Sequence, residues 1–168
     1  MKSQMNGLAC VWILVMLTTA VSVACAKSPF RINGVSHIDD PQLRNTVVTY
    51  YHSEAMEDWT TAYRFRSLSF RHLVPFGKYS REMQASNTGW SLEQVDIFSA
   101  RCENGDCHIR IRFLERIAKS VAGQRNLGSV SKEVSVENTI WRLTNNKWYV
   151  LDAGTRNHLG LNANIADN

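Results

Sequence analysis

The run Cys-Glu-Asn-Gly-Asp-Cys, at residues 102–107, leaves this part of the chain few folds to choose from. Asn-Gly is the strongest short signal for a β-hairpin, because a type I′ turn needs a positive φ at both central residues. With Asn104 and Gly105 in the loop, Cys102 faces Cys107 as a non-hydrogen-bonded pair with close Cβ atoms. The spacing therefore predicts a hairpin closed by a Cys102–Cys107 disulfide. A metal site using both cysteines and His108 would lack a second ligand cluster, so we expect no metal.

The same register predicts an apolar face further along this hairpin. Its next pairs on that face are Ala100–Ile109, Phe98–Ile111 and Asp96–Phe113. A carboxylate is out of place on an apolar face, because burying a charge is costly unless it is paired. Asp96 is therefore the candidate general base, and the alternative is a carboxylate at a sheet edge or bulge that is bonded to backbone or arginine.

A second hairpin is predicted to turn at Asn145-Asn146. Its pairs are Leu143–Trp148, Arg142–Tyr149, Trp141–Val150 and Ile140–Leu151. Upstream, the apolar residues change from even positions (Val134, Val136) to odd positions (Trp141). That change of frame predicts a bulge around residues 137–139, which would curve the sheet.

Helices are expected before the hairpins. Asp40-Pro41 is a helix start signal, with the aspartate as N-cap and proline at the first helical position. Apolar residues then recur at helical spacing up to Ala55, and a second apolar-aromatic stretch covers residues 59–70 and ends at Pro75-Phe76-Gly77. The order predicts an α+β fold: N-terminal helices packed on a curved four-stranded antiparallel sheet, preceded by a signal peptide.

The first 26 residues have the three parts of a secretory signal peptide: a weakly basic start, a short apolar run and small residues before the cleavage point. Ala24-Cys25-Ala26 fits cleavage before Lys27, which would release a soluble protein into the periplasm. The same stretch resembles a bacterial lipobox, in which Cys25 would be lipidated and anchor the protein to the cell envelope. We expect an exported protein by either route, in a compartment that permits disulfides.

The remaining boundaries follow from composition. Residues 27–39 are expected to be a linker, 40–153 the folded domain, 119–129 a loop within it, and 154–168 a loose C-terminal tail.

Composition adds little about partners. The 168 residues carry a net charge of +4, five scattered histidines and no phosphate-binding, nucleophile-elbow or zinc-protease motif, so no cofactor is expected. Residues 64–72 interleave arginines with Phe65 and Phe70, a pattern that can bind nucleic acid. Export argues against nucleic acid, whereas the overall positive charge is compatible with long-range attraction to an anionic partner such as a lipid head group or an envelope polymer. Membrane attachment is otherwise expected only through a lipid on Cys25, and nothing here predicts an oligomeric state.

The pattern resembles the nuclear-transport-factor-two-like superfamily, also called the cystatin-like cone fold. The residues that carry the resemblance are Tyr50-Tyr51, the acidic-Trp step Glu57-Asp58-Trp59, Ser67 to Arg71, and the closing hairpin at residues 140–150. The resemblance covers about residues 40–152. It implies a curved sheet wrapped around a long helix with a conical apolar pocket, in a family that contains both enzymes and exported modules without catalysis.

In such a fold, the aromatic and apolar residues expected to line the pocket are Tyr51, Trp59, Tyr63, Phe98, Ile111 and Phe113. The leading hypothesis is a non-catalytic envelope module that holds a partner protein or a small apolar ligand. One alternative is a pocket enzyme of the isomerase or dehydratase type with Asp96 as general base. Another is an inhibitor or immunity-like protein that binds its target through the sheet.

Overall fold

The computed structural model describes residues 29–118 and 132–153 of the chain. The strands are β1 (Arg31–Asn33), β2 (Trp90–Glu103), β3 (Asp106–Ile117), β4 (Lys132–Thr144) and β5 (Lys147–Asp152). The helices are the short 3-10 helix η1 (Val35–His37) and the α-helices α1 (Pro41–Ala55), α2 (Trp59–Arg64), α3 (Leu68–Leu73) and α4 (Phe76–Asn87). The predicted signal peptide, loop and tail, at 1–26, 119–129 and 154–168, lie outside the described residues.

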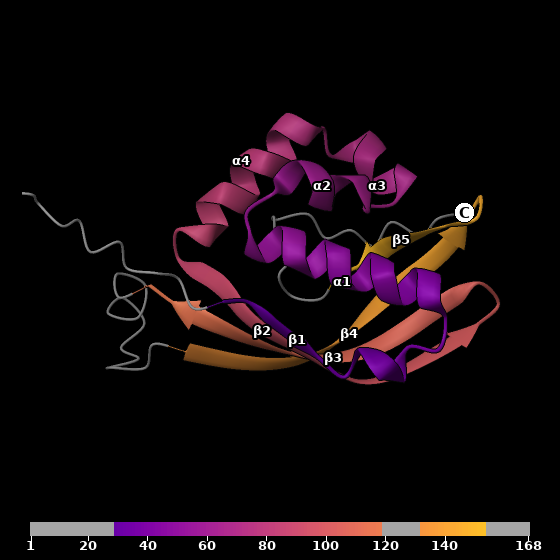
Figure 1. Cartoon of the computed structure of the whole chain (residues 1–168). Helices are drawn as coiled ribbons and strands as arrows, with labels where there is room; N and C mark the ends of the chain where they lie inside the picture. The colour runs from indigo at the N-terminus through magenta and orange to yellow at the C-terminus, as the bar shows by residue number, and fades with distance from the viewer. Residues whose placement is uncertain (1–28, 119–131, 154–168) are drawn as a thin grey trace, which may run out of the picture.

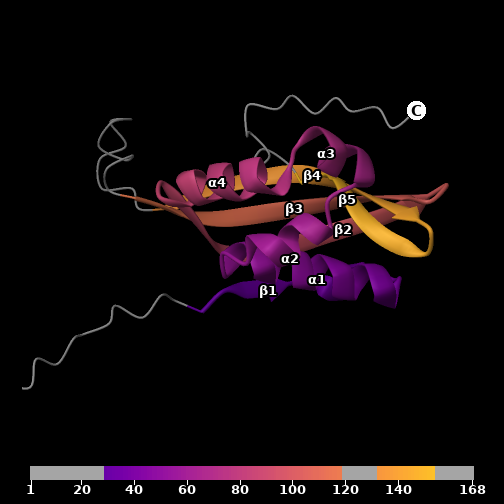
Figure 2. The same cartoon turned by 90° about the horizontal axis from the view of Figure 1, so that it is seen from above.

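The fold is α+β, with all four α-helices on one face of the sheet (Figures 1 and 2). The expected sheet of four antiparallel strands is corrected in one respect, because the described residues form five strands in the order β1-β2-β3-β4-β5. The additional strand, β1, pairs parallel with β2 and lies in the stretch expected to be a linker. The helices therefore do not begin the fold, since β1 and η1 precede them.

Helix α1 begins where the sequence predicts. The Asp40 side chain accepts hydrogen bonds from the backbone N–H groups of Gln42 (2.7 Å) and Leu43 (2.9 Å), and Pro41 is the first helical residue. Satisfying these orphan donors stabilises a helix start by about 1 kcal/mol. The apolar side of α1, with Leu43, Val47, Tyr50 and Tyr51 fully buried, packs on the sheet.

The second helical stretch differs from the prediction. It divides into α2 and α3, and Pro75-Phe76-Gly77, expected to end it, instead begins α4. Pro75 is the N-cap of this twelve-residue helix. Tyr79 and Met83 supply its buried face, an i, i+4 pair too short to reveal a helix by periodicity.

Both hairpin tips have the predicted register. Asn104, Gly105, Asn145 and Asn146 all have positive φ, as type I′ turns require. Cys102 faces Cys107 with their sulfur atoms at disulfide distance, and Leu143 faces Trp148. Further from the second tip, Ile140 pairs with Asp152 instead of the expected Leu151, because the β4–β5 register shifts between Ile140 and Trp141.

A bulge in β2 overturns the predicted face of Asp96. The β2–β3 register shifts between Ile97 and Ser99, so Ile97 faces Ile111 and Asp96 faces Arg112. Because strand side chains alternate, one inserted residue moves those beyond it to the opposite face. The bulge predicted at residues 137–139 is wrong as well, since the β3–β4 register runs without a shift from Asp106–Arg142 to Arg116–Lys132.

Candidate functional site

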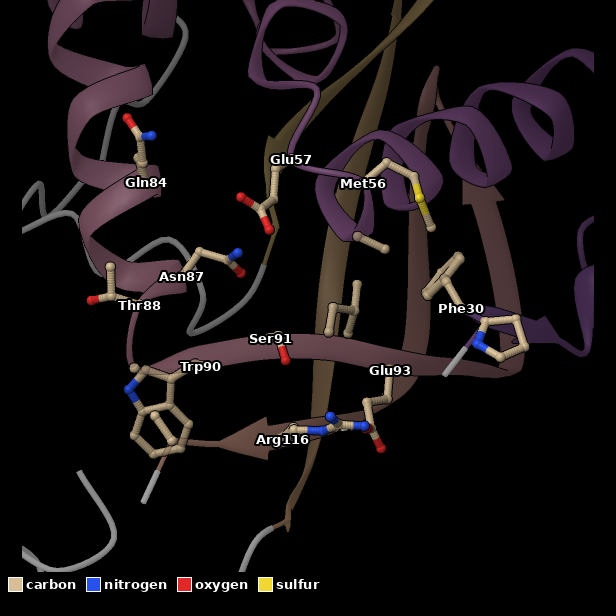
Figure 3. Close-up of a pocket in the computed structure, with 15 residues that line it drawn as sticks. Phe30, Met56, Glu57, Gln84, Asn87, Thr88, Trp90, Ser91, Glu93 and Arg116 are labelled. Carbon is tan, nitrogen blue, oxygen red and sulfur yellow. Dashed lines mark hydrogen bonds and ion pairs between the residues drawn. The ribbon is translucent and has the colours of Figure 1, made fainter. Parts of the chain in front are cut away.

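A cavity of about 660 Å³ lies at one end of the sheet, where β2 extends beyond the short strand β1. Its walls come from the C-terminal ends of α1 and α4, the first residues of β2 and the last of β3 (Figure 3). Ligand sites in proteins commonly span 300–1,000 Å³, so this cavity has the size of a small-molecule site.

The walls combine apolar surface with uncharged hydrogen-bonding groups. Phe30, Met56, Trp90 and Leu92 contribute apolar side chains. The polar, uncharged side chains are those of Gln84, Asn87, Thr88 and Ser91. An apolar lining with a few polar groups is what binds and orients a small organic molecule.

Glu57 enters this cavity from a backbone conformation that disfavours its own side chain. The Glu57 N–H donates to the carbonyl of Glu54 (3.2 Å) and the Asp58 N–H donates to that of Ser53 (2.8 Å), which together form a Schellman motif at the end of α1. Glu57 occupies the C′ position with φ +63°, where glycine is the usual residue. From this position the Glu57 side chain extends between α1 and α4, toward Asn87 (Figure 3).

The second carboxylate in the cavity wall is neutralised by cations. Glu93 accepts a hydrogen bond from Arg116 Nε (2.6 Å), and its other oxygen lies 2.8 Å from Lys132 Nζ. Burial raises the pKa of Glu93, but the hydrogen bonds and charges of Lys132 and Arg116 outweigh it, and the net pKa lies below its ordinary value. A carboxylate held in its charged form is a weak general base.

Asp96, the predicted general base, lies outside this cavity. Its Oδ2 accepts from Arg112 Nη2 (2.6 Å) and Nε (2.9 Å), and its Oδ1 accepts from Asn33 (2.7 Å) and Gln94 (2.8 Å). Burial raises the pKa of Asp96, but hydrogen bonds from Asn33, Arg112 and Gln94 lower it by a larger amount, so the net pKa lies below its ordinary value. The structure thus gives the alternative stated from the sequence, a bonded carboxylate next to a bulge.

The six residues predicted to line a pocket do not meet in one place. Tyr51, Ile111 and Phe113 are buried in the core between α1 and the sheet. Trp59 and Tyr63 belong to a second apolar cluster with α3 and α4, and Phe98 is 42% exposed, with the Arg112 guanidinium carbon 5.4 Å from its ring centroid. None of the six is among the residues that line the cavity.

Aromatic rings fill the interior where the resemblance implies a conical pocket. The Tyr50 ring lies 5.5 Å from that of Trp141, and the Tyr51 ring lies 5.5 Å from that of Phe113. The Tyr50 hydroxyl donates to the buried Glu54 carboxylate (2.6 Å), and burial raises the pKa of this tyrosine well above its ordinary value. Side-chain packing therefore closes the centre of the fold, and the open volume lies at its end.

Sequence reasoning singled out Glu57 within the acidic-Trp step but did not place it in a site. The available signal was the absence of glycine at the end of a helix whose last apolar residue is Ala55. Met56, Gln84, Asn87 and Trp90 carry no comparable signal, because their proximity depends on how α4 packs.

The part of the chain that the structure describes contains neither a cluster of metal-ligating side chains nor a helix that could span a membrane. No group of three or more His, Cys, Asp or Glu residues there is arranged to hold a metal ion. None of the helices in residues 29–118 and 132–153 combines the length and apolarity needed to cross a bilayer.

Comparison with known proteins identifies related folds only. No protein-family model matches the sequence, and no curated protein is significantly similar to it. A SEC-C motif protein of Psychrobacter arcticus is 8% identical with a TM-score of 0.50, over 69% of this chain and 62% of that one. A SEC-C motif protein of Rhodopseudomonas palustris is 11% identical with a TM-score of 0.48, over 64% and 73%.

An NTF2-like transpeptidase of Campylobacter jejuni is 13% identical over 63% of this chain and 94% of that one, with a TM-score of 0.40. TM-scores of 0.48 and 0.40 are too low to establish a shared fold. Membership of the nuclear-transport-factor-two-like superfamily therefore stays a prediction from the sequence. The Psychrobacter structure shows that this chain shares an α+β fold with a solved protein, and it spans less than two thirds of that protein's length.

Proposed function

We propose that this protein is a non-catalytic binding module that holds a small, largely apolar ligand in the cavity at the end of the sheet. The observation that carries the proposal is Glu57. A glutamate occupies a left-handed position that favours glycine, and it lies in the wall of a cavity of ligand size.

The lining defines the class of ligand. Phe30, Met56, Trp90 and Leu92 favour an apolar body, while Asn87 and Glu57 offer a donor and an acceptor to a polar end. Arg116 and Lys132 bring one more positive charge than Glu93 cancels, and the Glu57 carboxylate in the same wall offsets it, so the wall as a whole adds little attraction for a charged group. A neutral molecule with a hydrogen-bond donor for Glu57 fits best.

The enzyme alternative has less support. It needed Asp96 as a base inside a pocket, and Asp96 is instead bound to Arg112 with a lowered pKa. Every carboxylate with a resolved pKa shift in residues 29–118 and 132–153 (Asp58, Glu93, Asp96 and Asp106) is shifted downward. General-base catalysis near neutral pH favours a carboxylate with a raised pKa.

Protein binding through the sheet is a second candidate. Phe98, Val134 and Val136 are exposed. By strand alternation they lie on the face opposite the helices, which suits the inhibitor-like or accessory role inferred from the sequence.

An exported location remains part of the proposal. It is supported by the sequence of residues 1–26 and by the cysteine pair at disulfide distance, which oxidising compartments favour.

Binding of a neutral fluorescent probe such as Nile red tests the cavity. We expect saturable binding that weakens at least fivefold in Glu57→Gln and Met56→Ala, with unchanged binding in Leu143→Ala, an exposed apolar residue elsewhere. Chemical-shift changes on probe addition should cluster at residues 84–93. Equal binding by all variants, or shifts that map to another surface, would exclude this cavity as the site.

A further inference from the structure

Three of the eight exposed large apolar residues in the described chain lie within nine residues of one another, between the start of α3 and the start of α4. Leu68 is 51%, Leu73 62% and Phe76 41% exposed. Exposed apolar side chains that gather on one part of a protein surface are typical of an interaction site, whereas isolated ones are not. We refer to these three residues as the α3–α4 corner; α3 and α4 lie on the side of the fold away from the sheet (Figure 1).

The chain around this corner is basic and contains no acid. Residues 59–81 contain five arginines and lysines and no aspartate or glutamate. Arg66 is buried, and the other four reach solvent: Arg64, Arg71, Lys78 and Arg81. His72 is exposed as well. Two acids border this segment. Asp58 interacts electrostatically with Arg64, and the Glu82 carboxylate lies 3.9 Å from Lys78 in a partly exposed pair. Surface pairs of this kind compensate little of the positive charge.

The corner is held rigidly by the residues beneath it. The Tyr63 hydroxyl donates to the carbonyls of Val74 (2.7 Å) and Arg71 (3.2 Å), and the Tyr63 ring lies 5.3 Å from that of Phe76. Under the same helices, the buried Arg66 guanidinium carbon lies 4.5 Å from the Phe70 ring centroid. The exposed apolar residues are therefore presented by a packed structure and do not depend on a loop for their position.

We propose that the α3–α4 corner docks on the surface of an anionic phospholipid bilayer. Leu73 and Phe76 enter the boundary between head groups and acyl chains, while Arg64, Arg71 and Lys78 contact lipid phosphates. Exposed apolar residues flanked by cations are the combination that binds a protein in the plane of a membrane surface. A single-stranded nucleic acid would engage the cations and stack on Phe76 but gain little from Leu68 and Leu73, so the two exposed leucines favour a bilayer.

Vesicle co-sedimentation tests the proposal with the exported product of the full gene, its N-terminus determined by mass spectrometry. Vesicles of phosphatidylcholine and phosphatidylglycerol (3:1) are compared with pure phosphatidylcholine. The pure vesicles measure any attachment through residues 1–26 or a lipid on Cys25, because that attachment needs no anionic charge. We expect tighter binding to the anionic vesicles, and the difference should shrink as salt is raised.

Two variants separate the contributions. Each cation near an anionic surface strengthens binding roughly fivefold, so Arg64→Gln/Arg71→Gln/Lys78→Gln should lose on the order of 100-fold on anionic vesicles. Leu73→Ser/Phe76→Ser keeps the charge and should lose at least tenfold. The matched sheet control, Arg31→Gln/Arg101→Gln/Arg110→Gln, removes three exposed cations from strands β1, β2 and β3 and should bind like wild type. Thermal unfolding of each variant confirms that it is folded.

Three results would overturn the proposal. The first is equal binding to the two kinds of vesicle. The second is a loss of affinity for anionic vesicles in the sheet control as large as the loss in Arg64→Gln/Arg71→Gln/Lys78→Gln. The third is unchanged vesicle binding by Leu73→Ser/Phe76→Ser together with binding of a 20-nucleotide single strand, which would make the corner a polyanion site.

Discussion

Replacing Glu57 by glycine should make the protein more stable while weakening ligand binding. A left-handed conformation costs a non-glycine residue roughly 1–2 kcal/mol. Glycine avoids that cost but loses more backbone freedom on folding, by about 0.5–1 kcal/mol. We therefore expect a net gain near 1 kcal/mol in the free energy of unfolding. For a domain of this size, that corresponds to a rise of roughly 3–5 °C in Tm.

The comparison with Glu57→Ala isolates the backbone contribution. Both variants lose the carboxylate, so any contact that it makes is absent from both, and only alanine keeps the strain at φ +63°. In urea unfolding followed by circular dichroism, Glu57→Gly should exceed Glu57→Ala by about 1 kcal/mol. Both variants should bind Nile red more weakly than wild type. Equal stability of the two variants would refute the claim that this position is strained.

Two further predictions concern the stability of the sheet. Gly34 has φ +71°, and a Cβ there would overlap the Ile97 carbonyl oxygen. Gly34→Ala should therefore lower the free energy of unfolding, measured by thermal unfolding, by at least about 2 kcal/mol. The control is Gly77→Ala, where a Cβ meets nothing within 4 Å, and it should be neutral or stabilising. The lowered folded-state pKa of Asp96 makes its pair with Arg112 stabilising above the unfolded-state pKa, and that stability is lost as pH falls through the folded-state pKa. Urea midpoints between pH 7 and pH 2 should therefore fall less steeply in Asp96→Asn than in wild type, and parallel curves would contradict the assignment.

Local signals predicted the hairpin tips and the start of α1. The Asn104-Gly105 turn, the facing cysteines and the Asp40 cap each depend on residues within a few positions of one another, and the structure confirms all three. The α+β class follows from the same signals, because two hairpins after a helical region leave few other arrangements.

Residues far apart in sequence determined what local signals missed. The residues of strand β1 have the composition of a linker, and only their pairing with β2 makes them a strand. The adjacent Gly34 lies against the backbone of Ile97, where the β2 register shifts. The shift assigns Asp96 to the face of Arg112, opposite to the face predicted from alternation alone. The inward frame changes along β2, from Val95 and Ile97 to Ala100, but the exposed Phe98 is apolar too and conceals in the sequence where that change occurs.

The candidate site shows the same division. By itself, the sequence determined the start of α1 and the two hairpin tips, because these are short-range choices of backbone conformation. Only the tertiary structure decided that aromatic rings fill the centre of the fold and that the open volume lies beside Glu57. Packing of α1 and α4 against β2 sets that volume, and the free energy of such packing depends on the shapes of side chains that are distant along the chain.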